Sequence, residues 1–216
     1  MQARIAQFDA ERMRMLAAVG HDLRTPLTSL RIRAEMLATD ESTAMIRTLD
    51  EMTVMADGLV AYARGAHDTD DVVSVDLAVL LERVCGERNA RFKAQEPLRV
   101  RGRPVALGRA FGNLIDNALR YGETAELIAK RDDEDVIVTI TDDGPGIPED
   151  RLANVFDPFV RGDDSRSTDT GGVGLGLAIS RDIIAAHGGT ILLENRQEGG
   201  LRAIVRLPIN TTVAQR

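Results

Sequence analysis

The stretch Leu16-Ala17-Ala18-Val19-Gly20-His21-Asp22-Leu23-Arg24-Thr25-Pro26-Leu27 decides the fold of the first part of the chain. Its apolar residues recur every three or four positions, which is typical of a helix with a coiled-coil seam. This seam comprises Leu16, Val19, Leu23, Leu27, Leu30, Ala34 and Leu37. A second seam comprises Met45, Leu49, Met52, Ala56, Leu59 and Ala63. The pattern predicts a helical hairpin.

The residues between the two seams, Thr39-Asp40-Glu41-Ser42, supply turn and N-cap chemistry. Two helices alone cannot enclose a core, and both seams would otherwise remain exposed. We therefore expect the hairpin to pair with a second copy as a four-helix bundle.

The whole chain has the composition of an ordinary globular protein, with 216 residues, of which 44% are hydrophobic and 28% charged. No apolar run approaches the roughly 18 residues of a membrane span, and the N-terminus lacks a signal-peptide pattern, so we expect a soluble chain or a piece of a longer membrane protein. The single cysteine, Cys85, excludes an internal disulfide. A net charge of −7 and 3% aromatic residues argue against nucleic-acid binding.

The organisation changes after the hairpin, at the polar segment 65–71. We predict a helical dimerisation hairpin over 1–65, a linker over 66–75 and a second domain over 76–216. Strands are expected at 72–75, 125–130, 136–141, 191–194 and 202–207, with an extended segment at 98–101. Helices are expected at 76–88, 104–121 and from about 173 to 187. This alternation predicts an α/β sandwich, one sheet covered on one face by helices.

The first candidate site lies on the first helix. His21 lies off the apolar seam and faces solvent, and Thr25 shares its face one turn later. A neutral imidazole is a capable nucleophile near pH 7, and Asp22 could orient the ring or take its proton. Pro26 is expected to kink the helix just past the histidine. The alternative is an ordinary exposed histidine beside an acid.

Polar residues also form a stripe on the helix at 104–121, where Asn113, Asn117 and Arg120 share a face. Amide oxygens suit Mg²⁺ and arginine suits phosphate. The stripe Leu107, Phe111, Leu114 and Ala118 is expected to pack elsewhere on that helix. A merely solvated face is the alternative.

Two glycine-containing segments complete the set of candidate sites. The first directly follows a strand and reads Asp142-Asp143-Gly144-Pro145-Gly146-Ile147-Pro148. Its glycines let the backbone approach a planar ligand, and a carboxylate there can accept a hydrogen bond from an exocyclic amine. Gly171-Gly172-Val173-Gly174-Leu175-Gly176-Leu177 opens a helix, whose amides suit an anion. The alternative for the first segment is a tight turn without a ligand. The alternative for the second is a glycine-rich loop without a bound anion, because this segment lacks the lysine of a Walker motif.

In their order along the chain, these motifs resemble the catalytic core of a sensor histidine kinase of two-component systems. His21-Asp22-Leu23-Arg24-Thr25-Pro26 is similar to the H box, and Asn113 to Asn117 to the N box. Asp142-Asp143-Gly144-Pro145-Gly146 resembles the first glycine box, Phe156-Asp157-Pro158-Phe159 the F box and Gly172 to Leu177 the last glycine box. Arg120-Tyr121-Gly122 and the segment 159–163 resemble the EnvZ-like branch. Two positions depart from the family pattern. Gly20 stands where the family more often has Ser or Asn, and Val173 stands where Thr or Ser is common.

The resemblance implies a dimeric phosphoacceptor hairpin followed by an ATP-binding domain of the Bergerat (GHKL) type. Asp142 would accept from the adenine amine, Asn117 would coordinate Mg²⁺, and the segment 161–171 would form a lid. The residues expected to bind nucleotide are Asn113, Asn117, Arg120, Tyr121, Asp142, Gly144, Gly146, Ile147, Arg161, Gly162, Gly171, Gly172, Val173, Gly174, Leu175, Gly176 and Leu177.

The implied reaction is attack of His21 on the γ-phosphoryl of ATP, with Asp22 assisting, then transfer to an aspartate of a response-regulator receiver domain. Thr25 resembles the family's phosphatase position. Residues around Arg31, Arg33 and Glu35 are expected to select the regulator. We expect a homodimer without nucleic-acid partners, and a cytoplasmic location as part of an inner-membrane kinase whose anchor lies upstream of this chain.

Two other function classes remain open from the sequence. One is another ATPase of the same superfamily, such as a chaperone, a topoisomerase fragment or an anti-sigma serine kinase, which would lack a histidine-bearing hairpin. The other is a dimeric scaffold without turnover. Three further residues are interpreted as structural. Cys85 is expected in the core, His67 in the linker and His187 at a helix C-terminus.

Overall fold

The computed structural model describes residues 2–37, 39–65, 70–94, 97–158, 160 and 174–209, and side chains in these ranges except at 2–14, 16–17 and 61–65. The described residues form two compact units: the N-terminal helices make up one, and the described residues between 70 and 160 and between 176 and 209 make up the other. Residues 66–69, including His67, lie outside the described part. No helix in the described ranges is long and apolar enough to cross a membrane.

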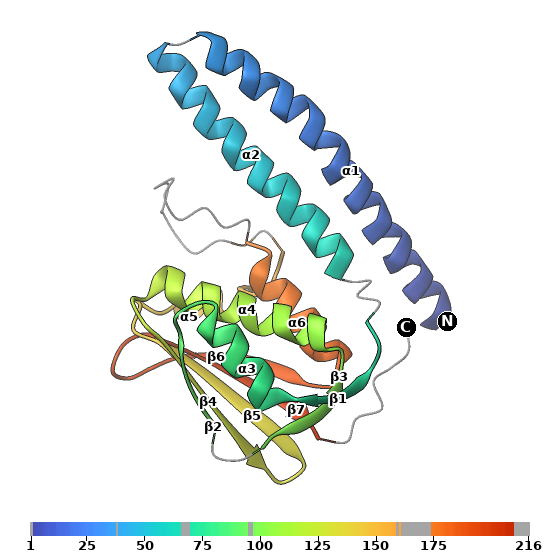
Figure 1. Ribbon diagram of the computed structural model, residues 1–216, viewed down its shortest axis with the longest axis vertical. Helices are drawn as coiled ribbons and strands as arrows, with labels where there is room; N and C mark the ends of the chain where they lie inside the picture. Colours follow the sequence, from blue (N-terminus) through green and yellow to red (C-terminus); the bar gives the residue numbers. More distant parts are fainter. Residues whose placement is uncertain are drawn as a thin grey trace. The chain divides into compact units, whose positions relative to one another are not determined.

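The first unit is a pair of long helices, α1 (Gln2–Leu37) and α2 (Asp40–Gly65), which pack against each other as a hairpin (Figure 1). The predicted cap forms just before α2. The Thr39 hydroxyl accepts from the Ser42 backbone N–H at 3.1 Å, and the Ser42 hydroxyl accepts from the Thr39 N–H at 3.0 Å. These reciprocal bonds satisfy free amides at the start of α2 and fix the reversal of the chain.

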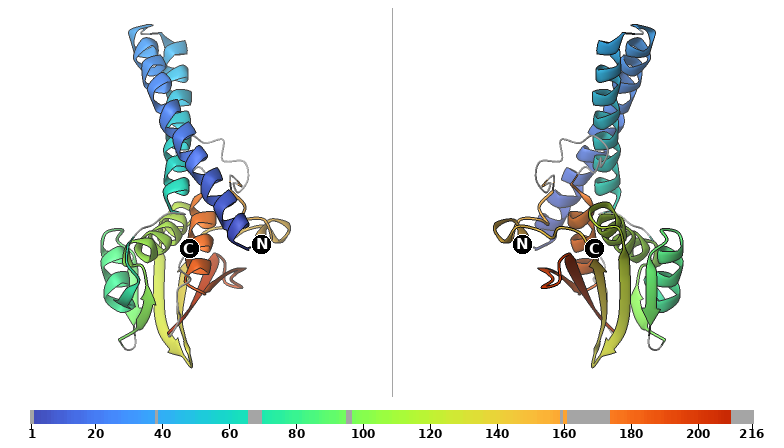
Figure 2. Two further views of the ribbon diagram at one scale, coloured as in Figure 1. Left: turned by 90° about the vertical axis from the view of Figure 1, so that its right-hand side faces the viewer. Right: turned by 90° about the vertical axis from the view of Figure 1, so that its left-hand side faces the viewer.

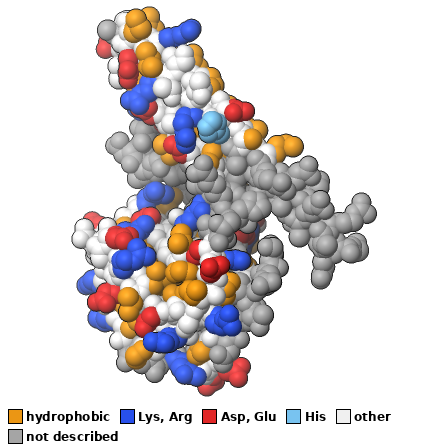
Figure 3. Space-filling view, turned by 45° about the vertical axis from the view of Figure 1, so that its right-hand side comes forward, with side chains coloured by type: hydrophobic (Ala, Val, Ile, Leu, Met, Phe, Trp, Pro, Cys, Tyr) orange, Lys and Arg blue, Asp and Glu red, His pale blue; other side chains and the backbone are white. Residues whose placement is uncertain are grey.

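The two helices bury only four of the eleven predicted seam residues whose side chains are described. Leu27 and Ala34 of α1 pack with Leu49 and Ala56 of α2, whereas the intervening seam residues are exposed. These exposed residues are Val19, Leu23, Leu30, Leu37, Met45 and Met52. Hydrophobic side chains are accordingly visible on the surface of the hairpin (Figure 3). One partner helix is too narrow to cover a full seam, so each helix keeps an uncovered apolar row.

The second unit contains a mixed sheet of five strands in the order β2-β4-β5-β7-β6. These strands are β2 (Arg91–Ala94), β4 (Ala125–Asp132), β5 (Asp135–Asp142), β6 (Thr190–Asn195) and β7 (Leu201–Pro208). The pair β2–β4 is parallel and the remaining pairs are antiparallel. Strand β2 was not predicted, because its sequence Arg-Phe-Lys-Ala is short and half of its residues are charged, as suits an edge strand.

Helices cover one face of this sheet, as the sequence predicts (Figure 2). Along β7 the residues Leu201, Ala203, Val205 and Leu207 are buried and alternate with more exposed neighbours, which is typical of a sheet with one covered face. The covering helices are α3 (Leu77–Gly86), α4 (Pro104–Tyr121) and α6 (Gly176–Ala186). A short helix, α5 (Glu149–Leu152), follows the loop after β5.

A second sheet of two antiparallel strands, β1 (Val73–Asp76) and β3 (Arg99–Gly102), completes the unit. Asp76 accepts from the Val79 N–H and caps α3, as predicted. Upstream of β1, Asp70 accepts from the Val105 N–H at 2.9 Å, so this part of the predicted linker 66–75 contacts the second unit.

Candidate active site

The phosphoacceptor candidates lie on the solvent side of α1. The side chain of His21 is 71% exposed, and its Nδ1 lies 3.6 Å from Oδ1 of Asp22, which is 85% exposed. Thr25 is exposed as well. Because α1 continues as a helix through Pro26, His21 and Thr25 share one face at adjacent turns. The second imidazole nitrogen, Nε2, has no partner among the described residues.

Gly20, directly before His21, lies at a close approach of the two helices. A Cβ at this position would be 2.6 Å from Cγ2 of Val60 and 3.0 Å from the carbonyl oxygen of Ala56. A serine or asparagine could not be accommodated without moving α2 away. The departure from the family pattern therefore has a packing reason, which sequence reasoning could not supply.

Two ion pairs connect the helices near this surface. Arg24 pairs with Asp57, with Nε donating to Oδ1 at 3.1 Å. Arg31 lies 3.2 Å from Asp50 on α2 and 3.3 Å from Glu35. Two of the residues expected to select a partner, Arg31 and Glu35, are thus engaged in a network that spans the hairpin.

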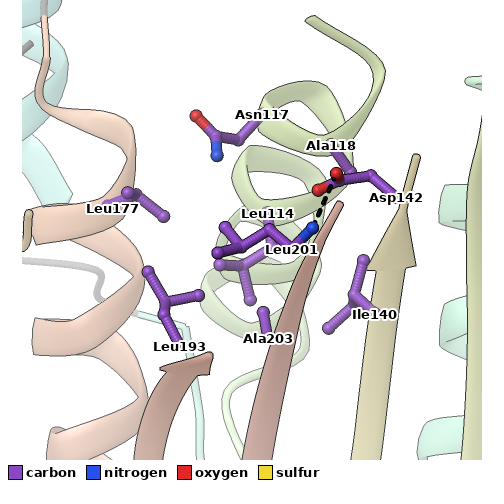
Figure 4. A pocket seen from close by; sticks show the side chains of 9 residues that line it. All are labelled: Leu114, Asn117, Ala118, Ile140, Asp142, Leu177, Leu193, Leu201 and Ala203. Atoms are coloured by element: carbon purple, nitrogen blue, oxygen red, sulfur yellow. Dashed lines mark hydrogen bonds between the residues drawn. The ribbon is translucent and has the colours of Figure 1, made fainter. Parts of the chain in front are cut away.

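The second unit contains a small pocket between α4, α6 and the sheet (Figure 4). Predicted binding residues from three separate segments, Asn117, Asp142 and Leu177, lie in its wall. The rest of the wall is apolar: Leu114, Ala118, Ile140, Leu193, Leu201 and Ala203. The expectation that Leu114 and Ala118 pack elsewhere was wrong, since they border the same pocket as Asn117. A small apolar pocket with few polar groups suits a planar ring.

The carboxylate of Asp142 is the polar group with the most defined geometry in this pocket. It is buried at 6% exposure, and its Oδ1 accepts from the backbone N–H of Gly144 at 2.9 Å and of Leu201 at 3.0 Å. The other oxygen, Oδ2, has no partner among the described residues. One oxygen is therefore held by the protein, and the other is available to accept from a ligand.

The glycines of the loop after β5 are required by protein contacts rather than by ligand approach alone. A Cβ on Gly144 would lie 2.5 Å from the carbonyl oxygen of Tyr121, and Gly146 has a φ of +77° with the side chain of Asn195 beside it. The loop is thus packed between the end of α4 and the end of β6. Ile147 donates its N–H to Asn195 Oδ1 at 2.8 Å.

The next residue, Asp143, holds the chain that follows α4. It accepts from the backbone N–H groups of Glu123 and Thr124 and from the Thr124 hydroxyl. These hydrogen bonds, the Thr124 N–H first among them, lower the pKa of Asp143 below its ordinary value. Asp143 therefore has a positioning role, and Asp142 alone faces the pocket.

The polar stripe on α4 divides into different roles. Asn117 lies in the pocket wall, while Nδ2 of Asn113 lies 3.4 Å from the carbonyl oxygen of Gly176 and connects α4 with α6. Arg120 and Tyr121 are exposed and lie outside the pocket wall. The amide of Asn117 makes no hydrogen bond to the described residues, which leaves its oxygen free for a cation.

A metal ion would depend on more than protein ligands at this site. No cluster of three or more His, Cys, Asp or Glu residues that could hold a metal occurs in the described ranges. A single amide oxygen beside a nucleotide pocket fits Mg²⁺, which commonly takes one or two protein ligands and completes its shell with phosphate and water.

The last glycine-rich segment is described only in its second half. Gly174 has a φ of +72°, and α6 begins at Gly176. The predicted nucleotide-binding residues Arg161, Gly162, Gly171, Gly172 and Val173 lie outside the described residues, as does the whole of the predicted lid.

Two family models match the chain and correspond to its two units. Residues 102–211 match the histidine kinase-, DNA gyrase B- and HSP90-like ATPase family, and residues 11–61 match the His kinase A (phospho-acceptor) domain. The pocket with Asp142 lies within the first match and His21 within the second. An ATPase of the same superfamily without a phosphoacceptor hairpin is therefore excluded.

Similar proteins point to the same class. The sensor histidine kinase GtrS of Pseudomonas aeruginosa is 41% identical over 215 residues, covering 96% of this chain and 44% of GtrS. CpxA of Escherichia coli K12 is 34% identical over 217 residues, covering 91% of this chain and 47% of CpxA. The solved histidine kinase domain of the E. coli osmosensor EnvZ is 31% identical, with a TM-score of 0.52, covering 69% of this chain and 96% of that domain.

The combination of an ATPase fold with a histidine-bearing hairpin defines a protein-histidine kinase. The chain belongs to the sensor histidine kinases of two-component systems. It spans about half the length of the curated relatives it matches.

Proposed function

We propose that this protein transfers the γ-phosphoryl group of ATP to His21 and passes it to an aspartate of a response-regulator receiver domain. The observation that carries the proposal is the pairing of an exposed histidine on one unit with a pocket on the other whose buried carboxylate keeps one free oxygen. This is the arrangement that a phosphoacceptor and a nucleotide site require.

The surroundings of His21 support a role as nucleophile. With Nδ1 on the side of Asp22, Nε2 is left to attack phosphorus. The lone pair of Nε2 forms the new N–P bond as the bond from the γ-phosphorus to its bridging oxygen breaks and ADP leaves. Asp22 stabilises the proton on Nδ1 and accepts it from the phosphorylated ring.

The pocket supports adenine as the recognised base. Asp142 Oδ2 would accept from the exocyclic amine, while leucine and alanine side chains contact the ring. Asn117 would hold Mg²⁺, which when bound offsets negative charge on the phosphates. Gly174, Leu175 and the first amides of α6 lie where backbone N–H groups suit an anion, and we place the phosphates there.

The partner-directed steps are the finer part of the proposal. We infer that the receiver domain docks on the face of α1 that carries His21 and Thr25, and that the Thr25 hydroxyl orients water against the aspartyl phosphate. Arg31, Arg33 and Glu35 lie farther along α1 and would contribute to the choice of regulator. The kinase acts as a homodimer through the hairpin.

The direct test is labelling with γ-³²P ATP in the presence of Mg²⁺. We expect a label that is lost in acid and retained in alkali, because phosphohistidine has that stability and phosphoserine has not. A label with the opposite stability, or no transfer to any regulator of the source organism, would refute the proposal.

Two neighbouring substitutions should separate the activities of the hairpin. His21→Ala removes the nucleophile, so we expect no labelling but unchanged ATP binding, since the pocket lies in the other unit. Thr25→Ala leaves His21 intact, so labelling should persist while dephosphorylation of the regulator slows. Equal loss of both activities in Thr25→Ala would contradict a separate role for this hydroxyl.

A further inference from the structure

The turn between β6 and β7 contacts the loop after β5, residues 142–148, although about fifty residues separate the two segments along the chain. The side-chain amide of Asn195, the last residue of β6, pairs with both backbone groups of Ile147. Its Oδ1 accepts from the Ile147 N–H at 2.8 Å, and its Nδ2 donates to the Ile147 carbonyl at 2.6 Å. This double contact fixes the orientation of the peptide at Ile147.

Arg196, the next residue of the turn, contacts Asp142 itself. Its Nη1 donates to the Asp142 backbone carbonyl at 2.7 Å, while its backbone N–H donates to Gly200 at 3.0 Å and closes the turn. Directly after the turn, the Leu201 N–H donates to Asp142 Oδ1 at 3.0 Å. The turn therefore contacts Asp142 at both its main chain and its carboxylate.

The backbone of the turn is shaped for this close approach. Gly200 has a φ of +88°, and a Cβ at this position would overlap the carbonyl oxygen of Asp142. Gly146, on the opposite side, would place a Cβ 2.6 Å from Asn195 Oδ1. The two segments lie too close for a side chain at either glycine. The contact between them therefore depends on glycine at both positions.

We propose that Asn195 and Arg196 are positioning residues of the nucleotide site, which act by orienting Asp142 and the loop through Ile147. The inference rests on the proposed role of Asp142 as the acceptor of the adenine amine. Neither residue needs to touch the nucleotide. Arg196 holds the Asp142 main chain and Asn195 holds the Ile147 peptide. The Gly144 and Leu201 N–H groups hold Oδ1 of the Asp142 carboxylate, so that Oδ2 is presented to the pocket at a fixed angle.

A nucleotide without the exocyclic amine separates positioning from general stability. Purine riboside 5′-triphosphate has the same ring and phosphates as ATP but cannot donate to Asp142. If Asn195 acts through Asp142, Asn195→Ala should lower the affinity for ATP by roughly 3- to 10-fold, which is the scale of one or two neutral hydrogen bonds. The same variant should leave the affinity for the analogue nearly unchanged.

The experiment measures the dissociation constants of both triphosphates, with Mg²⁺ and the full chain, for the original protein and three variants. Arg196→Met is a second, independent variant that keeps the aliphatic stem but removes the donor to Asp142. Gln197→Ala is the matched control, because Gln197 is an exposed residue of the same turn. We expect reduced discrimination in Asn195→Ala and Arg196→Met, and none in the control.

The outcomes distinguish two kinds of failure. If the unaltered protein binds both triphosphates equally, the proposed role of Asp142 is wrong. If it prefers ATP and both variants keep that full preference, whatever their melting temperatures, the positioning role of Asn195 and Arg196 is wrong.

Discussion

The two oxygens of the Asp142 carboxylate have different surroundings in the structure. Oδ1 accepts two backbone N–H groups, and Oδ2 is free among the described residues. The residue pattern shows two adjacent aspartates between a strand and a glycine, and the family resemblance points to the first of them; the structure places Asp142 in the pocket wall. Asp143, which is bound to Glu123 and Thr124, turns the other way.

Asp142→Asn should abolish tight nucleotide binding while preserving the fold. The amide oxygen can still accept from Gly144 and Leu201, which places the NH₂ group, a donor, against the adenine amine, another donor. A lost charge-assisted hydrogen bond is worth about 1.5–3 kcal/mol, so ATP affinity should fall roughly 10- to 150-fold. Calorimetric titration measures the affinity and circular dichroism the fold. Unchanged affinity in a folded variant would show that Asp142 is not the acceptor.

Gly20→Ala should destabilise the hairpin, although alanine is the better helix former. The gain in helix propensity is about 1 kcal/mol, whereas overpacking costs about 1–3 kcal/mol, because the new Cβ would meet Val60 and the backbone of Ala56. Thermal unfolding followed by circular dichroism measures the difference. Gly86→Ala, at the end of α3 with nothing within 4 Å of its added Cβ, is the control and should not lower stability. A more stable Gly20→Ala variant would contradict the close packing of α1 and α2.

At the scale of elements, helix α4 is capped by residues distant in sequence. Arg103, at its N-cap position, offers no side-chain cap, and Asp70 accepts from the Val105 N–H instead. His187, at the end of α6, accepts from the Arg103 N–H at 3.0 Å through Nε2 and donates from Nδ1 to the Ile183 carbonyl. The interpretation of His187 as a helix C-terminal residue is confirmed, and its second contact adds a connection to the start of α4.

His187 should make the second unit less stable in acid. Burial is the main cause that lowers its pKa below the ordinary value of 6.5, and the nearby charge of Arg103 adds to this, while Ile183 and Asp70 oppose it. The unfolded chain therefore binds a proton more readily than the folded one. The free energy of unfolding should fall as the pH drops below about 6.5 towards the lowered pKa, with no contribution from His187 at higher pH.

Denaturant unfolding at several pH values tests this, with His187→Gln as the matched variant. Glutamine can offer an acceptor to Arg103 and a donor to Ile183 but does not titrate. The variant should therefore show a weaker loss of stability between pH 6.5 and 5.5. The same slope in both proteins would assign the pH dependence to other groups.

At the scale of the whole molecule, the hairpin shows a regular division of its seams. Positions 20, 27 and 34 of α1 and 42, 49 and 56 of α2 are buried, each set at intervals of seven residues. The alternate set, Leu23, Leu30 and Leu37 with Met45 and Met52, is between 43% and 60% exposed. An uncovered apolar row of this length on each helix fits a second hairpin, which would complete a four-helix bundle.

The full chain should therefore sediment as a dimer, and a charge in the exposed row should dissociate it. Leu30→Glu places a carboxylate in the centre of that row, so we expect a shift towards monomer with the helix content retained. Ile32→Glu is the control, because Ile32 is equally apolar and 53% exposed but lies off the row. Sedimentation equilibrium at micromolar concentration measures both. A dimer that resists Leu30→Glu, or an original protein that is monomeric, would contradict the bundle.

The sequence by itself determined the elements and the chemistry that each one carries. These elements depend on residues only a few positions apart in the chain. Examples are the helix periodicity, the cap before α2, Pro104 at the start of α4 and the alternation in the strands. The ordered motifs also identified the class of protein. Strand β2 was missed because four residues, two of them charged, are too few to show a periodic pattern.

Only the tertiary structure decided how residues far apart in the chain come together. That Leu114 and Ala118 border the pocket, that Gly20 must lack a side chain, and that Asn195 and Arg196 hold Asp142 and Ile147 all depend on contacts across tens of residues. Such contacts follow from packing a sheet against helices, and a side chain's neighbours in that packing leave no pattern in a single sequence. The sequence therefore specifies which groups are present, and the packing decides which oxygen of Asp142 is free to bind.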